Sequence, residues 1–396
     1  MRTGGRVLAT GAALSLVLLA GCSSKPTFTF SGTLGTTPTG EATSAFDGPT
    51  PSVRAALPGI EHFVEQERGL KFKHPVKVKL LGSKAFVKLL DKGDKPPSRK
   101  AVNKSESVFA SLGLVSPRVN LYKAFKTATD TGTIGFYKFS NKRLYVRGTK
   151  ATPGVRAVMA HELTHALTDQ WFGLKRPKLR KDNQERQDAF TALSEGDAER
   201  TRLAYESQAL TPAQRAEAER EENEAGGGST PPDVPKVVLE LIGFPYAVGP
   251  DFVDAIVTDG GLKALNRAYR HPPVSSEQLL DPIAYENHDN PKHVATPRAD
   301  GTRLEHGDLG LIGLLLTFER GLSNDRTHQA LTGWGGDQFA TWQTGKRRWC
   351  LRDTVVMDYG VATTAFQHGL KAWVATRHGK AHIEHLGKRT TFVTCS

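Results

Sequence analysis

The sequence predicts an α+β protein, in which a small mixed sheet and a largely helical segment are followed by a smaller α+β unit. Strand-like alternation is confined to a stretch around residues 75–147, capped helical patterns dominate residues 152–269, and alternating segments return in the last hundred residues. At 396 residues the chain exceeds the usual single-core size of about 250 to 300 residues. More than one folding unit is therefore expected.

Residues 1–22 are typical of an export signal. Arg2 and Arg6 form a basic start, and the apolar run that follows is too short for a comfortable membrane span. The run ends in "LAGC", which resembles the bacterial lipobox, where the signal is cut before the Cys and that Cys receives lipid. An ordinary signal with a stray Cys is the alternative. Lipid on Cys22 would anchor the protein to the outer face of the bacterial cell membrane.

Residues 23–54 are rich in Ser, Thr, Gly and Pro and contain almost no aliphatic side chains. Such a segment cannot build a core and is expected to act as a flexible tether. We expect a main domain over residues 55–300 and a C-terminal α+β unit over residues 301–396.

The sequence of the first part of the main domain predicts a small mixed sheet. "HPVKVKLL" alternates as a strand does, while "SKAFVKLLDK" and "SESVFASLGLV" have helical patterns. "TIGFYKFSNKRLYVRG" predicts two strands around a turn at Ser140 and Asn141. The strand "KRLYVR" is a candidate edge strand for binding a substrate backbone, although a plain structural strand is the favoured interpretation.

Helices are expected over most of the rest of the main domain. Thr152 and Pro153 suit the start of a helix that Gly173 ends, and Thr211 and Gln214 have the spacing of a capping box. The expected helices cover residues 153–172, 187–208 and 212–225, with a further helical region over residues 237–269 that breaks at Gly243 and Gly249. "YRHPPVSSEQLLDP" is expected to be a loop.

In the C-terminal unit, "LGLIGLLLTF" predicts a buried helix and "GVATTAFQHGLKAWVAT" a second one. A hairpin is expected to turn at Thr344 and Gly345, and "TTFVTC" to form the last strand. The histidines of "HGKAHIEH" are expected in a solvated turn rather than at a metal. Apart from Cys22, the cysteines are Cys350 and Cys395, which predict one disulfide in an oxidising compartment, with two free buried thiols as the alternative.

The stretch "VMAHELTHALTDQW" contains candidate metal ligands and a candidate general base. His161 and His165 lie one helical turn apart and can present both imidazoles to one ion, and Glu162 is placed to act as a general base. Catalytic zinc takes three protein ligands and keeps one position for water. The third ligand is expected to be Glu195.

Two acidic residues follow Glu195 on the same predicted helix and compete for the ligand role. Glu199 lies one turn beyond Glu195 and is better placed to accept the second ring N–H of a ligand histidine. Asp197 is the other candidate for this supporting role.

The order of "HELTH" and the downstream helical "SEGDAE" resembles the gluzincin metallopeptidases, the thermolysin-like superfamily. More closely, "AHELTHALTDQ", "ALSEGDA", "FPYAVGPDFV" and "PPVSSEQLLDP" resemble a group of exported bacterial lipoprotein metallopeptidases, over about residues 158–282. The resemblance implies a zincin-like catalytic domain with Zn²⁺ as its cofactor. It also implies peptide-bond hydrolysis, with Glu162 as the base and His161, His165 and Glu195 as ligands.

One position departs from the resemblance. Asp281 stands where we expect a histidine before Pro282, so a transition-state donor expected there has to come from elsewhere. Tyr246 in "FPYAVG" and His271 are the candidates for stabilising the tetrahedral oxyanion.

The formal net charge is +12, and losing Arg2 and Arg6 with the signal leaves +10. Anionic lipid or an anionic envelope polymer explains this charge for an anchored exported protein, and the absence of an arginine-rich, aromatic-interleaved motif argues against nucleic acid as a partner. The favoured function is a lipid-anchored zinc metallopeptidase that acts on peptides or proteins. The alternative is a catalytically silent zinc-binding lipoprotein that serves as a binding or assembly module. Glu162 favours the first and Asp281 the second.

Overall fold

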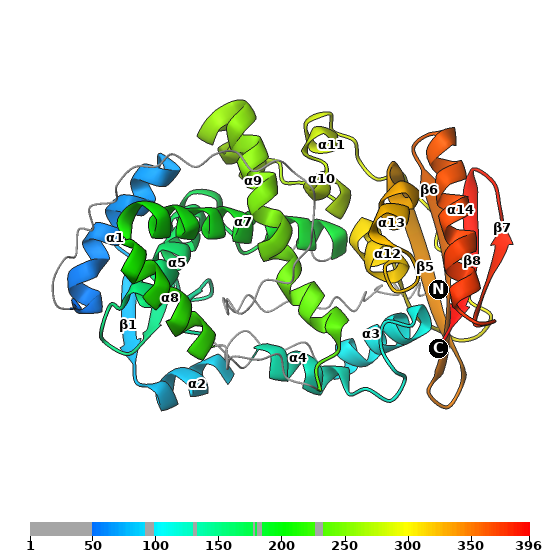
Figure 1. The fold of residues 1–396 in the computed structure, drawn as a ribbon, viewed down its shortest axis with the longest axis horizontal. Helices are drawn as coiled ribbons and strands as arrows, with labels where there is room; N and C mark the ends of the chain where they lie inside the picture. Colours follow the sequence, from blue (N-terminus) through cyan, green and yellow to red (C-terminus); the bar gives the residue numbers. More distant parts are fainter. Residues whose placement is uncertain (1–49, 92–98, 130–132, 177–178, 180–183, 226–232) are drawn as a thin grey trace, which may run out of the picture.

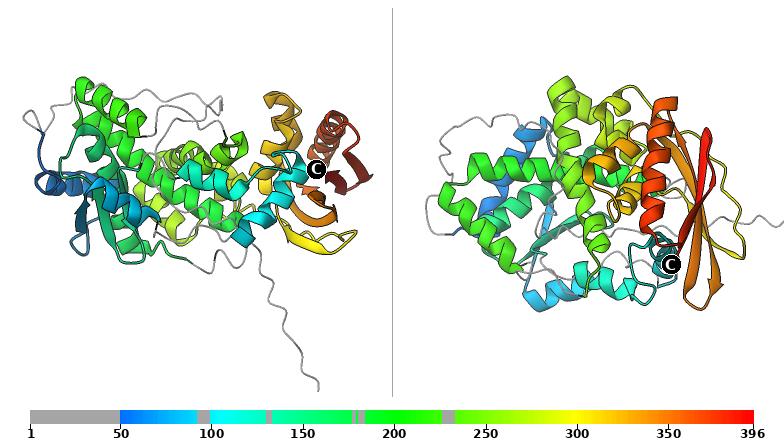
Figure 2. Two further views of the ribbon diagram at one scale, coloured as in Figure 1. Left: turned by 90° about the horizontal axis from the view of Figure 1, so that it is seen from below. Right: turned by 45° about the vertical axis from the view of Figure 1, so that its right-hand side comes forward.

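The structure is a computed structural model that describes residues 50–91, 99–129, 133–176, 179, 184–225 and 233–396. The predicted signal with Cys22, most of the tether and the glycines at 226–228 lie outside these residues. The described chain is mixed α+β, as predicted, with more helix than strand (Figure 1). A small sheet lies at one end of the molecule and a larger sheet at the other, with the long helix α9 between them (Figures 1 and 2).

The small sheet has three strands in the order β1-β3-β2. These are β1 (Lys77–Leu81), β2 (Gly135–Lys138) and β3 (Arg143–Arg147). β1 is parallel to β3 and β2 is antiparallel to it, which confirms a mixed sheet. Because β3 is the central strand, the interpretation of "KRLYVR" as an edge strand is wrong. The edges are β1 and β2.

The helices around this sheet follow the predicted patterns, with two additions, α1 and α4. They are α1 (Val53–Arg68), α2 (Ser83–Asp91), α3 (Arg99–Leu112), α4 (Leu121–Thr129), α5 (Pro153–Phe172), α7 (Gln184–Ala209) and α8 (Pro212–Ala225). α1 begins at Val53 because the Ser52 side chain accepts a hydrogen bond from the backbone N–H of Ala55. The last two residues assigned to the tether therefore belong to a helix.

The two predicted helix caps are confirmed. The Thr152 hydroxyl accepts a hydrogen bond from Val155 N at the start of α5, and Gly173 ends that helix with a φ of 67°. At α8, Thr211 N donates to Gln214 Oε1 and Gln214 N donates to Thr211 Oγ1, the reciprocal bonds of a capping box. Such contacts satisfy some of the N–H groups that the first turn of a helix leaves free.

The helix α9 (Lys236–Arg270) runs through both predicted breaks, and its non-helical residue is Gly261 instead. Gly249 serves close packing: a Cβ there would lie 2.2 Å from the carbonyl oxygen of Ala192 on α7. α9 is long and apolar enough to span a membrane by length and composition alone. In the structure it packs along α7, and Val237, Phe252 and other side chains are buried in the largest core cluster.

The predicted loop after α9 contains two short helices, α10 (Ser276–Leu280) and α11 (Pro282–Glu286). The loop prediction is wrong there because each short helix begins at a local cap. The two prolines before α10, Pro272 and Pro273, obscured this signal in the sequence. Ser275 Oγ accepts from Gln278 N at α10. The Asp281 carboxylate accepts from Ile283 N and Ala284 N at α11.

The C-terminal sheet is antiparallel throughout, in the order β4-β5-β6-β8-β7. Its core is shared with helices α12, α13 and α14. The strands are β4 (Arg303–Gly307), β5 (Trp334–Gly345), β6 (Arg348–Met357), β7 (Ala381–His385) and β8 (Arg389–Cys395); the helices are α12 (Gly310–Phe318), α13 (Asn324–Leu331) and α14 (Gly360–Thr376). The buried helix, the second helix and the last strand are confirmed.

Two details of this unit differ from the prediction. The hairpin turns at Lys346 and Arg347, two residues later than expected, because β5 continues to Gly345. His382 and His385 lie on β7 rather than in a turn, with exposed side chains, since pairing with β8 overrides the polar local sequence. The predicted disulfide is confirmed: Cys350 on β6 and Cys395 on β8 are directly opposite each other and bonded.

α3 joins the two parts of the molecule. Ser107 Oγ lies 3.2 Å from Thr341 Oγ1 of β5, and the carbonyl oxygen of Ser111 accepts hydrogen bonds from Thr394 on β8 and Arg377. A segment early in the chain therefore supports the C-terminal sheet, and the largest core cluster includes residues of both parts.

Candidate metal centre

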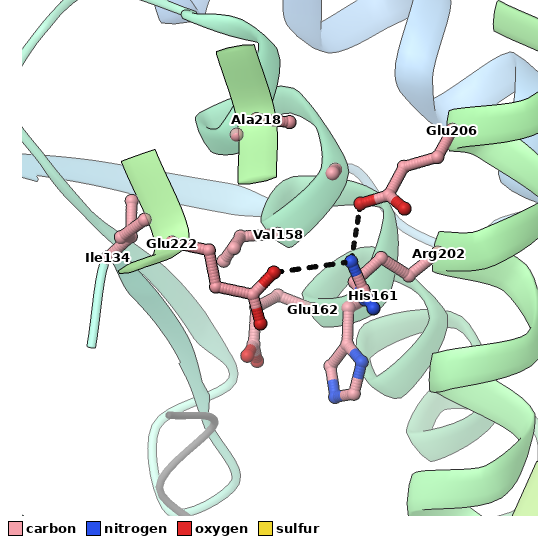
Figure 3. A pocket seen from close by; sticks show the side chains of 10 residues that line it. Ile134, Val158, His161, Glu162, Arg202, Glu206, Ala218 and Glu222 are labelled. Carbon is pink, nitrogen blue, oxygen red and sulfur yellow. Dashed lines mark hydrogen bonds and ion pairs between the residues drawn. The ribbon is translucent and has the colours of Figure 1, made fainter. Parts of the chain in front are cut away.

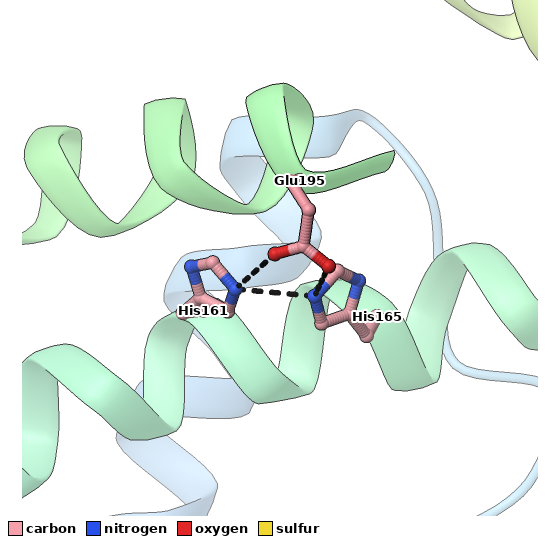
Figure 4. A group of neighbouring side chains, drawn as sticks. All are labelled: His161, His165 and Glu195. Carbon is pink, nitrogen blue, oxygen red and sulfur yellow. Dashed lines mark hydrogen bonds and ion pairs between the residues drawn. The ribbon is translucent and has the colours of Figure 1, made fainter. Parts of the chain in front are cut away.

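Two helices bring the three predicted ligands together (Figure 4). His161 and His165 point from one face of α5, and Glu195 reaches them from α7. His161 Nε2 lies 3.1 Å from His165 Nε2 and 3.2 Å from Glu195 Oε2, and His165 Nε2 lies 3.4 Å from Glu195 Oε1. The three side chains can each offer one ligand atom within 4.8 Å of the others, so this group could hold a metal ion.

The opposite face of α5 fixes the position of the histidines. Met159, Leu163 and Leu167 are buried in a core cluster shared with α1 and the small sheet. The ligand side chains are themselves 1–3% exposed, so their polar atoms need partners within the protein or a bound ion.

Side chains of α7 lie next to the outer ring nitrogens of both histidines. Glu199 Oε2 lies 3.6 Å from His161 Nδ1, which is longer than a hydrogen bond, and Arg202 holds the same carboxylate through two hydrogen bonds of 2.8 and 2.6 Å. Ser194 Oγ lies 3.3 Å from His165 Nδ1. Glu199 therefore lies where the sequence placed it. Ser194 was missed, although it directly precedes Glu195.

The histidines and glutamates of this cluster strongly shift one another's pKa values. Burial by itself would lower the pKa of His161, but the carboxylates of Glu195 and Glu199 outweigh it and raise that pKa to about 10. For Glu195, burial raises the pKa, yet the two histidines dominate and hold it well below its usual range. The carboxylates are thus the ionised partners of the imidazoles.

Asp197 points to another part of the protein. Its carboxylate accepts hydrogen bonds from Arg68 Nε at 3.0 Å and from the Tyr269 hydroxyl at 2.8 Å. It lies two residues from Glu195, so it leaves α7 on a different face. Asp197 joins α1, α7 and α9, and none of its described bonds is to the histidines.

Glu162 has one fixed and one open oxygen. Its Oε2 accepts a 2.6 Å hydrogen bond from Tyr137 N of the edge strand β2, whereas Oε1 has no hydrogen-bond partner among the described residues. Burial raises the pKa of Glu162, and His161 and His165 partly offset the rise. A buried carboxylate with one open oxygen is suited to exchange a proton.

Tyr137 was missed by sequence reasoning. Its backbone N–H orients Glu162, and its hydroxyl donates a 3.0 Å hydrogen bond to Asp169 Oδ2, which also pairs with Lys142. The alternation of "GFYKF" indicated a strand but contained no signal of which helix residue it would meet. That contact depends on how β2 packs against α5.

The two candidate oxyanion donors have different surroundings. Tyr246 on α9 places its ring 6.3 Å from the ring of His161, at an angle of 29° between the planes. His271 ends α9 with an exposed side chain, and its carbonyl oxygen accepts a hydrogen bond from the Tyr285 hydroxyl. The structure brings Tyr246 to the metal centre, and none of the described contacts of His271 involves the ligands.

Asp281 is a helix cap rather than part of this centre. Its side chain is exposed and begins α11. The preceding helix α10 meets α7 at Glu185, whose carboxylate accepts hydrogen bonds from Ser276. Glu185 lies about 15 Å along α7 from Glu195, because each helical residue rises about 1.5 Å.

The described residues therefore bring six predicted or supporting side chains to one place and leave Asp197 and His271 outside it. The six are His161, Glu162, His165, Glu195, Glu199 and Tyr246. No protein-family model, curated protein or solved structure matches this chain.

Proposed function

We propose that this protein is a zinc metallopeptidase with a zincin-like catalytic domain, exported and held at the outer face of the cell membrane by lipid on Cys22. The observation that carries the proposal is the open oxygen of Glu162 beside the convergent His161, His165 and Glu195. A structural metal site has no need of an unpartnered base next to its ligands.

The spacing of the ligand atoms fits a tetrahedral ion. Ligands about 2.1 Å from a tetrahedral zinc ion are about 3.4 Å from one another. The two histidine nitrogens are 3.1 Å apart, and each lies 3.2 or 3.4 Å from a different oxygen of Glu195, Oε2 for His161 and Oε1 for His165. One ligand atom from each residue can be chosen so that all three lie within 4.8 Å of one another. Two histidines and one glutamate leave a fourth position open. Zinc bound there would supply an acidic water and polarise the substrate carbonyl.

Glu162 would act as the general base and then as the general acid. Oε1 takes a proton from the attacking water, and the same oxygen returns it to the amine that leaves. The hydrogen bond from Tyr137 N to Oε2 keeps the carboxylate in one orientation during both transfers. The raised pKa of Glu162 brings its basicity closer to neutral pH, where proton transfer in both directions is most efficient.

The surrounding residues would prepare the site for this reaction. Ser194 would orient the ring of His165 through its contact with Nδ1, and the Glu199 carboxylate, 3.6 Å from His161 Nδ1, would stabilise the His161 ring electrostatically. The Tyr246 hydroxyl is our candidate donor to the tetrahedral oxyanion, because its ring lies beside that of His161. Asp281 itself caps α11 with an exposed side chain, so we assign this role to Tyr246 instead.

The proposal is tested on the full chain by measuring bound zinc and cleavage of a broad peptide library, with Glu162→Gln beside it. Glu224→Gln is the control, since Glu224 is an exposed glutamate on α8. We expect one equivalent of zinc in all three proteins and cleavage reduced by about a hundredfold or more in Glu162→Gln alone.

Two other outcomes decide between the alternatives. Zinc in every protein without cleavage would favour the silent binding module, and absence of zinc from the parent would contradict both functions. Intact-mass analysis of the mature protein for lipid on Cys22 tests the anchor separately.

A further inference from the structure

We propose that one face of the small sheet, together with the outer side of α2, docks on the headgroups of an anionic phospholipid bilayer. This surface lies at the end of the molecule opposite the C-terminal sheet (Figure 1). We call it the basic face; its members are Lys77, Lys79, Lys84, Lys88, Lys138, Arg143 and Arg147. The choice of partner rests on the proposed location at the cell membrane, whereas docking itself requires neither zinc nor lipid on Cys22.

The side chains of the small sheet divide between its two faces. Successive residues of a strand point to opposite faces, and directly paired residues of neighbouring strands point to the same face. One face is apolar, since Leu144 and Val146 pack in the core cluster shared with α1 and α5. On the other face Lys77 pairs with Arg143, and Arg143 pairs with Lys138. Three cationic side chains therefore form a row across all three strands, on the face directed away from α5.

The helix α2 extends the same surface. Phe86 packs on Phe136 of β2, with ring centroids 5.4 Å apart, so α2 covers the part of this face next to the cationic row. Lys84 and Lys88 lie two residues before and after Phe86, which turns them to the opposite side of the helix, and both are exposed. The neighbouring Val87 is 47% exposed. An apolar side chain among lysines can enter the interface of a bilayer while the lysines contact its headgroups.

No acidic residue offsets these charges locally in the sequence. Residues 69–90 contain six lysines and no Asp or Glu, and residues 133–150 contain five Lys and Arg and again no Asp or Glu. Within the described chain, no member of the basic face forms an ion pair, and Arg147 donates a hydrogen bond to Ser83 Oγ. Lys142 lies nearby but pairs with Asp169, so it is not counted. Positive potential is therefore concentrated on this face.

The N-terminal end of the described chain lies next to the basic face. Ser52 forms an antiparallel bridge with Lys150, three residues after β3 ends, and Val53 N donates a 2.9 Å hydrogen bond to the carbonyl oxygen of Thr149. Residues 23–49 separate this point from Cys22 and span at most about 95 Å when fully extended. Lipid on Cys22 would thus keep the domain near the bilayer without orienting it. The basic face supplies the orientation.

Docking on the basic face does not cover the metal centre with lipid. The helix α5 packs on the apolar face of the small sheet, so the sheet lies between α5 and the bilayer. The ligand side of α5 faces other helices: His161 and Glu162 line one pocket with Arg202 of α7 and Glu222 of α8 (Figure 3). Peptide cleavage and membrane docking therefore use different sides of the molecule.

The test measures co-sedimentation of the chain with vesicles after residues 1–22 have been removed. This removes the apolar run and the lipid site and leaves every described residue in place. The vesicles consist of phosphatidylcholine alone or of phosphatidylcholine with about one third phosphatidylglycerol. We expect binding to the anionic vesicles alone, and a steep loss of that binding as the salt concentration rises.

Two variants with equal net charge locate the binding surface. The basic-face variant carries Lys77→Gln, Lys79→Gln, Lys84→Gln and Lys88→Gln. The control variant changes four exposed lysines of the C-terminal unit: Lys346→Gln, Lys371→Gln, Lys380→Gln and Lys388→Gln. We expect the basic-face variant to lose about a hundredfold in affinity and the control to change at most about threefold. The urea midpoint of each variant checks its folding. If the basic-face variant is unfolded, Lys84→Gln with Lys88→Gln on the exposed side of α2 takes its place, with Lys371→Gln and Lys380→Gln as its control.

Three outcomes would overturn the docking surface. Absence of binding to the anionic vesicles would exclude an anionic bilayer as the partner, and equal losses in the two variants would mean that net charge alone explains binding. Binding to soluble polyphosphate but not to vesicles would assign the basic face to an anionic polymer instead. None of these results depends on zinc content or peptide cleavage, so failure of the docking surface and failure of the proposed peptidase are distinguishable.

Discussion

Replacing Asp353 by Asn is expected to stabilise the protein, and the gain in the free energy of unfolding is expected to grow as the pH rises from 5 to 7. Asp353 lies on β6 with no exposed surface, and neither carboxylate oxygen has a well-aligned hydrogen bond among the described residues. Asp337 on the neighbouring strand β5 is also buried, and its oxygens accept hydrogen bonds from Leu309 N and Gly310 N. Two carboxylates thus share one buried region of the C-terminal unit.

Burial, followed by the charges of nearby carboxylates, raises both pKa values. The pKa of Asp337 rises to about 7, with Asp308 as the next cause after burial, and that of Asp353 rises well above its usual range, with Asp337 as the next cause. Asp308 also acts on Glu185, whose pKa burial raises strongly. At neutral pH the folded protein therefore holds protons that the unfolded chain has lost.

The sign of the pH dependence follows from this difference. Both states are protonated below the unfolded pKa of about 3.9, so no penalty exists there. Above it, only the folded state keeps the proton, and each such group lowers the free energy of unfolding by about 1.4 kcal/mol per pH unit until its folded pKa is passed. Asn cannot ionise and lacks this loss. Between pH 5 and pH 7 the variant should gain about 3 kcal/mol relative to the parent.

The assay is urea unfolding of parent and Asp353→Asn at pH 5, 6, 7 and 8, without reductant. Asp259→Asn, at an exposed aspartate on α9, is the control and should follow the parent. Parallel pH profiles for parent and Asp353→Asn would refute the reasoning, because they would mean that Asp353 ionises equally in both states.

Three further predictions concern the metal centre and the disulfide. Glu199→Gln should weaken zinc affinity by about 10- to 100-fold, measured by competition with a chelator, because it removes the charged partner of His161 Nδ1; unchanged affinity would contradict the orienting role. Tyr246→Phe should lower kcat by about 100- to 1000-fold with a nearly unchanged KM if its hydroxyl stabilises the oxyanion, and full activity would remove Tyr246 as the donor. Replacing both Cys350 and Cys395 by Ser should lower the free energy of unfolding by about 4 kcal/mol for their separation of 45 residues; an unchanged urea midpoint would argue against this contribution.

Local signals were the most reliable part of the sequence. Thr152, Gly173 and the pair Thr211 and Gln214 predicted helix ends correctly, because caps act through hydrogen bonds within one turn. The disulfide was predicted as well, since the chain has just two cysteines beyond Cys22.

Predictions from local sequence were wrong where tertiary packing competes with the local preference. Gly243 and Gly249 were expected to break α9, but the penalty of a glycine inside a helix is only about 1 kcal/mol. Burial of α9 against α7 exceeds it, and Gly249 is needed for the close contact with Gly196. In the same way, Ala381–His385 has the sequence of a polar turn, but pairing with β8 makes it the strand β7.

The sequence by itself determined the chemistry that one helix can display. The spacing of His161 and His165 puts two imidazoles on one face of α5, and the helical register puts Glu199 one turn beyond Glu195, because α-helical geometry is the same in every protein. Only the tertiary structure decided that Tyr137 N holds Glu162, that Tyr246 lies beside His161 and that Glu221 fastens α8 to the start of α5. These contacts depend on how separate elements pack, and packing is set by side chains distant in the chain.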